Sequence, residues 1–417
     1  MRENKNKYIY LDHAAGTPMD PGVFKTMRKF LMINWANPSA LHQAGLEARA
    51  AIENARKNIA HILGAQKEEI IFTSGGTESN NLAILGALAS SSKFFSSCAL
   101  PGVPGGTLGD KKNRKTSLPH IVTTNIEHPS VLEVCRHLEK TKQADVTYVP
   151  VEPNGIVDPK KIKEAIKPNT VLVSVMYANN EIGTIQPIME IAKGIRHYRK
   201  ISNSVYPYFH IDAVQAMNYL PVKVDKLGVD LLSLNGSKIY GPKGTGVLYK
   251  KRNVNFSPQM YGGSQEFGLK PGTENVAGIV GLARALKITE EIKEKESKRL
   301  IPLRDYFIDK LKQFKNVIVN GDLRQRLPNN INISVTGIES DLLVIEFDAH
   351  AIAVSSKSAC KSDDPEESYV IKALRPLSKI EEGSIRFSLG RNTKKADIDC
   401  ALRAFKDIFS KLKKWYN

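Results

Sequence analysis

The chain has 417 residues, of which 41% are hydrophobic and 25% are charged. These proportions exclude a collagen-like, coiled-coil or wholly disordered protein, and the length suggests about two or three domains. Sixty Lys and Arg against 43 Asp and Glu give a net charge of +17, which favours an anionic partner such as nucleic acid, an acidic protein or a phosphate-bearing ligand. Charge alone does not choose among them.

Four cysteines, Cys98, Cys135, Cys360 and Cys400, are too few and too irregularly spaced for a disulfide framework or a CxxC zinc site. They predict a reducing compartment and no resident metal. The N-terminal sequence shows neither the apolar stretch of a secretory signal nor an Arg- and Ser-rich presequence, and no apolar run approaches the ~18 residues of a membrane span. We therefore expect a cytoplasmic protein without a membrane partner.

Short runs of β-branched residues alternate with helical patterns through the first two thirds of the chain. The expected strands are 70–73, 120–126, 145–151, 171–178, 208–213, 230–236 and 246–250. Continuous apolar strands separated by helices are typical of a mostly parallel sheet covered on both faces. We therefore predict an α/β fold that binds its ligand beyond the carboxyl ends of the strands.

A helical pattern over 276–314 follows this region. Strands at 316–320, 330–335 and 384–389 then interleave with helices at 339–348 and 394–414, which predicts a smaller α+β domain. The expected division is an N-terminal segment, 1–20, that packs with the small domain, a large domain, 21–275, and the small domain, 276–417.

One stretch, 90–119, is rich in Ser, Gly, Pro and Lys and shows neither a helical nor a strand period. It predicts a surface loop inserted in the large domain. Its basic cluster at 111–115 is expected to be solvated, and contact with an anionic partner is the alternative.

A glycine-rich turn at 73–80 follows an apolar strand and precedes a helical pattern. Glycines allow close approach of the backbone, and a helix N-terminus presents free N–H groups, so this turn is typical of a phosphate-binding site. A simple helix cap of Ser and Thr is the structural alternative. No Walker motif or GxGxxG is present, so nucleotide triphosphate and dinucleotide sites lose support.

Three chemically active residues are expected near strand ends. Lys238 lies in a turn-rich loop, where desolvation would make it a Schiff-base nucleophile. Asp212 ends an apolar strand, where its carboxylate needs a cation such as a protonated pyridine nitrogen, and His128 is placed to stack on a ring or move protons. Each residue alone is more often structural. Together with the phosphate-binding turn they supply what a pyridoxal phosphate site needs.

Ten motifs, in order and in spacing, resemble those of cysteine desulfurases, which belong to the class-V aminotransferase group of fold-type I pyridoxal phosphate enzymes. The motifs are LDHAAGTP (11–18), NPSALHQAG (37–45), TSGGTESNNLAI (73–84), IEHPSVL (126–132), NNEIGTIQP (179–187), HIDAVQA (210–216), SKIYGPKGTG (237–246), PGTENVAGIVG (271–281), SSKSACKS (355–362) and SIRFSLGR (384–391). The resemblance covers nearly the whole chain apart from 92–117. It implies a large pyridoxal-phosphate domain and a small domain that carries a catalytic cysteine loop.

The resemblance implies that Lys238 carries pyridoxal 5'-phosphate as a Schiff base, that Asp212 pairs with the pyridine nitrogen, and that His128 stacks on the ring and serves as acid and base. The other cofactor contacts that it implies are Gly76, Thr77, Asn179, Gln215 and Ser237, with Thr273 supplied by the second subunit of a homodimer. Arg386 would bind the substrate carboxylate through a guanidinium fork, and Asn179 would also contact the substrate, near the ring hydroxyl.

Cys360 decides the expected chemistry. The resemblance implies that its thiolate attacks the sulfur of L-cysteine, which leaves alanine and a Cys360 persulfide. The persulfide sulfur would pass to an iron–sulfur scaffold or a sulfur-carrier protein, for cluster assembly or tRNA thiolation. The long segment between Cys360 and Arg386 resembles the long-loop group of the family, and Cys360 could share a cluster transiently with a scaffold.

Other functions compete with this interpretation. A selenocysteine lyase or another class-V pyridoxal phosphate enzyme could use the same site. A basic RNA- or protein-binding module is the non-enzymatic alternative, although RNA-binding proteins usually present aromatic platforms and Phe, Trp and Tyr make up only 7% of this chain. Direct nucleic-acid binding is therefore not expected. Ser237 stands where the family often has His, and Phe267 where it often has Arg.

Overall fold

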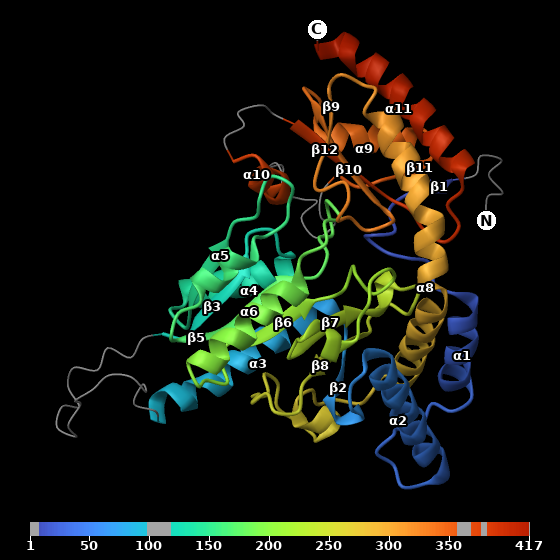
Figure 1. Ribbon diagram of the computed structural model, residues 1–417. Coiled ribbons are helices and arrows are strands. Elements are labelled where there is room, and N and C mark those ends of the chain that lie inside the picture. The colour runs from blue at the N-terminus through green and yellow to red at the C-terminus, as the bar shows by residue number, and fades with distance from the viewer. Residues whose placement is uncertain (1–7, 98–117, 357–367, 377–381, 417) are drawn as a thin grey trace, which may run out of the picture.

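The computed structural model describes residues 8–97, 118–356, 368–376 and 382–416 (Figure 1). Its centre is a seven-stranded sheet in the order β2–β8–β7–β6–β5–β3–β4. The strands are β2 (Ile70–Thr73), β3 (His120–Thr124), β4 (Asp145–Val149), β5 (Thr170–Met176), β6 (Tyr208–Asp212), β7 (Leu231–Asn235) and β8 (Gly246–Lys250). Strand β8 runs antiparallel to β2 and β7, and the other neighbouring strands of this sheet pair in parallel, so the predicted mostly parallel sheet is confirmed.

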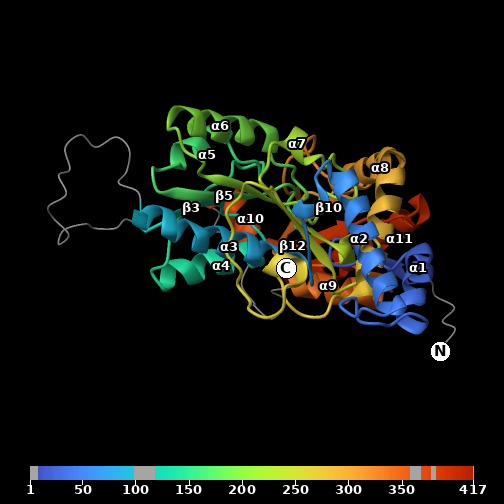
Figure 2. The ribbon, with the colours of Figure 1, turned by 90° about the horizontal axis from the view of Figure 1, so that it is seen from below.

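Helices cover both faces of this sheet (Figure 2). One face packs against α3 (Gly76–Ser97) and α4 (Pro129–Lys140). The other packs against α6 (Ile188–Ile201) and α7 (Val224–Leu227), with α5 (Pro159–Ala165) beside α6. Along β5, Leu172 belongs to the first core and Val173 to the second, because successive strand side chains point to opposite faces.

Helix α3 extends further than the sequence pattern predicts. The prediction that residues 90–97 belong to an irregular loop is wrong, since α3 continues to Ser97. The hydroxyls of Ser90 and Ser91 donate to Ala87 O at 2.8 Å and Leu88 O at 2.7 Å, so these serines bond to their own helix instead of ending it. The rest of the predicted loop, including the basic cluster at 111–115, lies outside the described residues.

The small domain contains a three-stranded antiparallel sheet of β9 (Val317–Val319), β10 (Asn330–Thr336) and β12 (Glu382–Ser388). Helices α9 (Ser340–Ala349) and α11 (Lys395–Tyr416) pack against it. The N-terminal segment joins this domain, because β1 (Ile9–Tyr10) pairs in parallel with β11 (Ile352–Ala353) and Leu11 is buried in the same core. The three-stranded sheet and its helices agree with the expected α+β character of the small domain.

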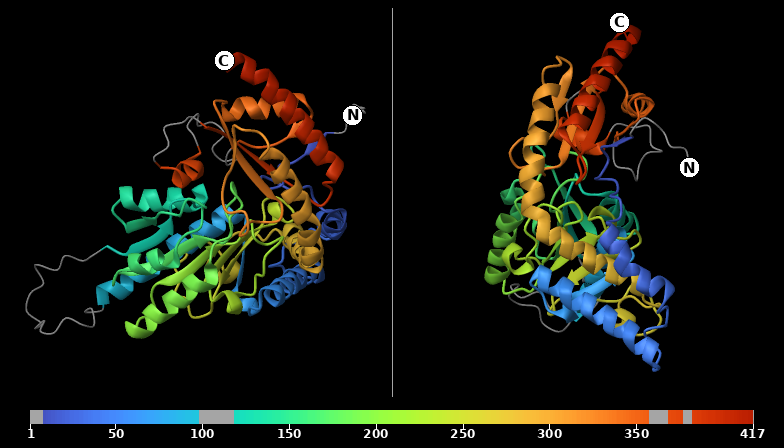
Figure 3. Two further views of the ribbon diagram at one scale, coloured as in Figure 1. Left: turned by 45° about the horizontal axis from the view of Figure 1, so that its top comes forward. Right: turned by 90° about the vertical axis from the view of Figure 1, so that its right-hand side faces the viewer.

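Helix α8 (Val276–Leu311) links the two cores (Figure 3). Its first part, around Leu282, packs against α1 (Pro21–Met32) and α2 (Gln43–Leu63), whereas its last part, around Phe307, lies in the small-domain core. The expected boundary after residue 275 therefore falls at the start of a helix that serves both cores, and the domain limits stay a prediction.

Short elements complete the described chain: the 3₁₀ turns η1 (Lys67–Glu69), η2 (Gly236–Lys238) and η3 (Gln265–Gly268), and helix α10 (Tyr369–Leu374). Helix α10 buries Val370 and Leu374 in the core of the large domain. The strands before and after it in the sequence, β11 and β12, belong to the small domain. None of the helices in the described ranges is long and apolar enough to cross a membrane.

Candidate active site

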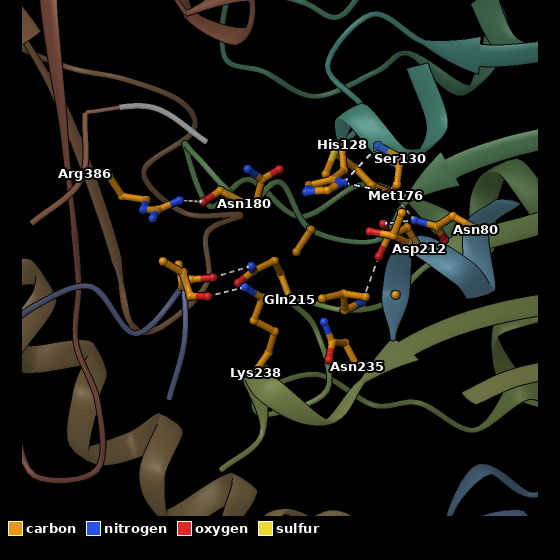
Figure 4. A pocket seen from close by; sticks show the side chains of 16 residues that line it. Asn80, His128, Ser130, Met176, Asn180, Asp212, Gln215, Asn235, Lys238 and Arg386 are labelled. Atoms are coloured by element: carbon orange, nitrogen blue, oxygen red, sulfur yellow. Dashed lines mark hydrogen bonds between the residues drawn. The ribbon is translucent and has the colours of Figure 1, made fainter. Parts of the chain in front are cut away.

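A pocket with a cavity volume of about 120 Å³ lies beyond the carboxyl ends of β5 and β6, where Arg386 of β12 reaches it from the small domain (Figure 4). This is where ligands bind in open parallel sheets. Its lining residues are Ala14, Ala15, Gly76, Thr77, Asn80, His128, Ser130, Met176, Ala178, Asn180, Asp212, Val214, Gln215, Asn235, Lys238 and Arg386.

Lys238 is held at the pocket by the turn η2, which follows β7 directly. Asn235 caps this turn, since its Oδ1 accepts from Ser237 N at 3.0 Å. The ammonium of Lys238 donates to Ala15 O at 2.5 Å, so the N-terminal segment holds the end of the lysine side chain. The loop around η2 is tied to the same segment because Thr17 Oγ1 donates to Ser237 O at 2.9 Å.

Asp212 is the last residue of β6 and is only 5% exposed. Its Oδ1 accepts from Val214 N at 2.9 Å, and its Oδ2 accepts from Asn80 Nδ2 at 2.7 Å. Neither donor carries a charge. A buried carboxylate whose side-chain and backbone donors in the described part of the chain are neutral is suited to a cationic ring nitrogen in the pocket.

His128 follows β3 and is the N-cap of α4, where its Nδ1 accepts from Ser130 N at 3.1 Å. The preceding residue, Glu127, is fully buried. Its Oε1 accepts from Thr124 Oγ1 at 2.6 Å and from Met176 N at 3.0 Å. Burial raises the pKa of Glu127 to about 8, so this carboxyl group holds its proton at neutral pH.

The glycine-rich turn forms a second cavity, of about 330 Å³, that shares Ala15, Gly76, Thr77 and Asn235 with the central pocket. It lies at the N-terminus of α3, where the first backbone N–H groups have no partner within the helix. Ser237 and Lys243 line its other side. A Cβ at position 76 would lie 2.8 Å from Val214 Cγ2, so glycine is needed for this close approach.

Arg386 enters the pocket from β12 of the small domain and is 2% exposed. Its Nη2 donates to Asp12 Oδ1 at 2.7 Å, and its Nη1 donates to Asn180 O at 2.8 Å. Its Nε is buried and has no hydrogen-bond partner among the described residues. The guanidinium is therefore a fixed cation with unused donor capacity, as the binding of a carboxylate requires.

The structure brings most of the predicted site residues together. Seven line the central pocket: Gly76, Thr77, His128, Asp212, Gln215, Lys238 and Arg386. Ser237 lines the adjoining cavity. Thr273 is exposed and lines neither cavity. Cys360 lies outside the described residues.

Asn179 is placed differently from the prediction. It is fully buried, its Nδ2 donates to Ile126 O at 2.9 Å, and its Oδ1 accepts from Glu181 N at 2.8 Å and Ile182 N at 2.9 Å. These bonds occupy both ends of the amide beneath the pocket. The neighbouring Asn180 lines the pocket in its place.

Sequence reasoning also missed Asn80 and Ser130, which line the pocket. Spacing could have found both. Asn80 lies four residues after Gly76, one helical turn further along α3, and Ser130 lies two residues after His128 in the first turn of α4.

Helix α10 begins after Ser368, and hydrogen bonds connect this end of the helix to the site. Ser368 Oγ donates to Glu181 Oε2 at 2.5 Å and caps the helix by accepting from Val370 N. Tyr369 OH donates to Glu127 O at 2.6 Å. The first two described residues after the predicted Cys360 segment are therefore bonded to the site, Ser368 to the turn that carries Asn180 and Tyr369 to the turn that carries His128.

Comparison with known proteins assigns the fold and the pocket to a class. The family described as aminotransferase class-V matches residues 9–94 and 110–400. A NifS-like protein of known structure superimposes with a TM-score of 0.84 at 32% identity, over 97% of this chain and 100% of that chain. A structure titled "SspA in complex with cysteine" gives a TM-score of 0.72 at 32% identity, over 91% of this chain and 98% of that chain.

Related sequences show to which group within this class the chain belongs. The cysteine desulfurase IscS of Dictyoglomus turgidum is 44% identical over 97% of this chain and 95% of its own length. That of Methanosarcina thermophila is 40% identical over 98% of this chain and 94% of its own length. The chain therefore belongs to the class-V aminotransferase family, within its group of cysteine desulfurases. Membership of this family implies dependence on pyridoxal phosphate.

Proposed function

We propose that this enzyme converts L-cysteine to L-alanine and takes up the sulfur as a persulfide on Cys360. One observation carries the proposal: a single pocket unites a lysine, a buried aspartate and a buried arginine from three separate parts of the chain. A transaminase or lyase could share these groups, but the relatives of this chain are cysteine desulfurases. Cys360, which the family resemblance singles out, would then receive the sulfur.

The pocket fits pyridoxal 5'-phosphate. Asp212 would hold the ring nitrogen, His128 would lie over the ring, and Gln215 and Asn180 would contact its edge. Gly76, Thr77 and Ser237 would hold the phosphate in the cavity at the start of α3, with the cationic Lys243 beside it. When bound to Lys238, the cofactor supplies an electron sink that makes the Cα hydrogen of the substrate acidic.

The residues of the chain then divide the work. Arg386 binds the substrate carboxylate, and its own bonds to Asp12 and Asn180 O fix the direction of the guanidinium. Lys238 Nζ, freed by the substrate amine, takes the Cα proton and returns a proton to the carbon skeleton. The Cys360 thiolate forms an S–S bond with the substrate sulfur as the C–S bond breaks, so that cysteine and one thiol give alanine and one persulfide.

A homodimer is part of the proposal. Around α1, α2 and the loop that precedes α8, large apolar side chains are exposed, among them Trp35 at 78% and Tyr261 at 86%. Because an exposed apolar surface of this kind marks an interaction site, we expect a second copy of the chain to cover it. Thr273 lies outside its own pocket and would then serve the phosphate cavity of the partner. Sedimentation should give a dimer that Trp35→Asp weakens.

The persulfide sulfur is expected to pass to an iron–sulfur scaffold or a sulfur-carrier protein, for cluster assembly or tRNA thiolation, in the cytoplasm. The described residues hold no group of three or more His, Cys, Asp or Glu side chains that could bind a metal ion.

Alanine formation tests the proposed function. Purified protein with pyridoxal phosphate, L-cysteine and a reductant should release alanine and sulfide, and Cys360→Ser should release neither while it keeps the cofactor absorbance. Alanine formation by Cys360→Ser at the normal rate would contradict the role of the cysteine. Pyruvate formation with an amino acceptor would instead identify a transaminase.

A further inference from the structure

A chain of hydrogen bonds joins Asp212, which is expected at the nitrogen of the cofactor ring, to His128, which is expected over the ring. Asn80, from α3, is 1% exposed and Ser130, from α4, is 7% exposed. The Nδ2 of Asn80 donates to Asp212 Oδ2 at 2.7 Å and to Ser130 Oγ at 2.8 Å. Ser130 Oγ lies 2.8 Å from His128 Nδ1, and Figure 4 shows these four side chains side by side at the pocket.

The direction of each bond that Asn80 makes follows from Asp212. A carboxylate only accepts, so the NH₂ group of Asn80 must face it, and a flipped amide would place two acceptor oxygens against each other. Each hydrogen of that NH₂ group is then used once. Ser130 Oγ accepts the second hydrogen. Because the backbone N–H of Ser130 points at His128 Nδ1, this nitrogen is an acceptor, and the O–H of Ser130 donates to it as well.

His128 Nδ1 therefore meets two donors, the hydroxyl and the backbone N–H of Ser130. A neutral imidazole has one acceptor nitrogen and one N–H, so its hydrogen must be on Nε2. A hydrogen on Nδ1 would face both donors and would break the cap of α4.

We propose that Asn80 and Ser130 are positioning residues that fix the tautomer of His128, so that His128 exchanges protons with the substrate only through Nε2. The inference rests on the proposed function in that it concerns the same pocket. It adds that two donors of Ser130 set the position of the proton on His128, and that Asn80 orients the hydroxyl donor from Asp212.

Ser130→Ala removes the hydroxyl and keeps the backbone donor, and Asn80→Ala removes the group that orients the hydroxyl. With the holoenzyme we expect kcat for alanine formation to fall about threefold in Ser130→Ala and about tenfold in Asn80→Ala, with KM within about twofold of wild type. Ser130→Thr should restore the rate. In ¹⁵N spectra of histidine-labelled protein, the pyridine-like signal of His128 should move from Nδ1 towards an average of both nitrogens in the two alanine variants.

Ser174→Ala is the matched control. Ser174 Oγ also lies 2.8 Å from a histidine Nδ1, that of His210, but both residues are buried in the sheet away from the pocket. This variant should leave kcat and the His128 signals unchanged. The proposal is supported only if kcat and the ring-nitrogen signals change together in Ser130→Ala and Asn80→Ala. It is overturned by a slower reaction with unchanged signals, by changed signals at full kcat, or by no change in either.

The spectra are recorded without substrate, which separates the two hypotheses. If wild type forms no alanine, the proposed function fails, while the signals of His128 still report its tautomer. If wild type forms alanine and the variants match it in rate and spectrum, the function stands and the tautomer hypothesis fails.

Discussion

Two histidines bonded to serines show how the middle of the sheet differs from its carboxyl edge. His210 lies in the middle of β6, and its two ring nitrogens are 2.8 Å from Ser174 Oγ and 3.0 Å from Ser233 Oγ on the neighbouring strands. Burial lowers the pKa of His210 to about 3. His128 bonds to a serine in the same way, but it stands after a strand end, beside a pocket.

The difference lies in what surrounds the ring. In the middle of the sheet, serines of the two neighbouring strands bond both ring nitrogens, so His210 is a neutral structural residue. At the carboxyl ends of the strands, Nδ1 of His128 is bonded to Ser130 in the turn into α4, and His128 lines the cavity. The same pair of residue types is therefore structural within the sheet and available for chemistry at its edge.

The largest expected effect is on kcat, and it distinguishes two lysines that lie near opposite ends of the strands of the large sheet. Lys238 follows β7 at the pocket, whereas Lys250 ends the antiparallel strand β8 and so lies at the other edge, where its Nζ donates to Val254 O at 3.1 Å. Lys238→Ala should lower kcat at least about 1000-fold, because it removes the base and the attachment point of the cofactor. Lys250→Ala should stay within about twofold. If the rate of alanine formation fell equally in both variants, the proposed difference between the two ends of the strands would be wrong.

Arginine provides the next comparison. Arg386→Lys should raise KM for L-cysteine about tenfold or more with a smaller change in kcat, because a lysine cannot offer the guanidinium fork to a carboxylate. Arg304 is also buried and donates to Arg326 O and Leu327 O within the small domain. Arg304→Lys should reduce stability and leave KM unchanged. Initial rates across a range of cysteine concentrations, with thermal melts, check both expectations.

The pH dependence of stability tests the comparison at Glu127, which lies just after β3 near the pocket but is fully buried. Its raised pKa means that the folded protein keeps a proton that the unfolded chain loses near pH 4.5. This contribution to stability is present below pH 4.5 and is lost as the pH rises to about 8, by an amount of order a few kcal/mol. Urea unfolding of Glu127→Gln should show a flatter pH dependence than wild type. Parallel curves for the two proteins would refute this assignment.

The smallest effect is expected within the sheet. Ser174→Ala leaves His210 Nδ1 buried without its partner, which should lower the free energy of unfolding by about 1–3 kcal/mol. Because the pKa of His210 is lowered on folding, wild type should also lose stability as the pH falls below about 6.5, where the unfolded histidine binds a proton. Urea titrations at pH 5 and 7 measure both, and unchanged alanine formation near pH 7 would confirm that the role is structural.

Much of the fold and of the site could be predicted from local patterns. The seven apolar runs of the large sheet, and the Lys, Asp and His near their ends, are visible in the sequence because a buried strand must be apolar and a polar residue at its end must meet a ligand or a partner. The helical extension through Ser97 was not visible, because serine side chains can either end a helix or bond back to it.

The sequence by itself determined the class of fold, the strands and the chemical groups near their ends, since burial and periodicity are local properties. Only the tertiary structure decided that Asn180 and not Asn179 faces the pocket, because adjacent side chains point in different directions and backbone groups bond both ends of the Asn179 amide. It also decided that Asn80 connects Asp212 to Ser130, and that Arg386 reaches the pocket from β12. These contacts join residues from 50 to 206 positions apart, and packing alone creates them.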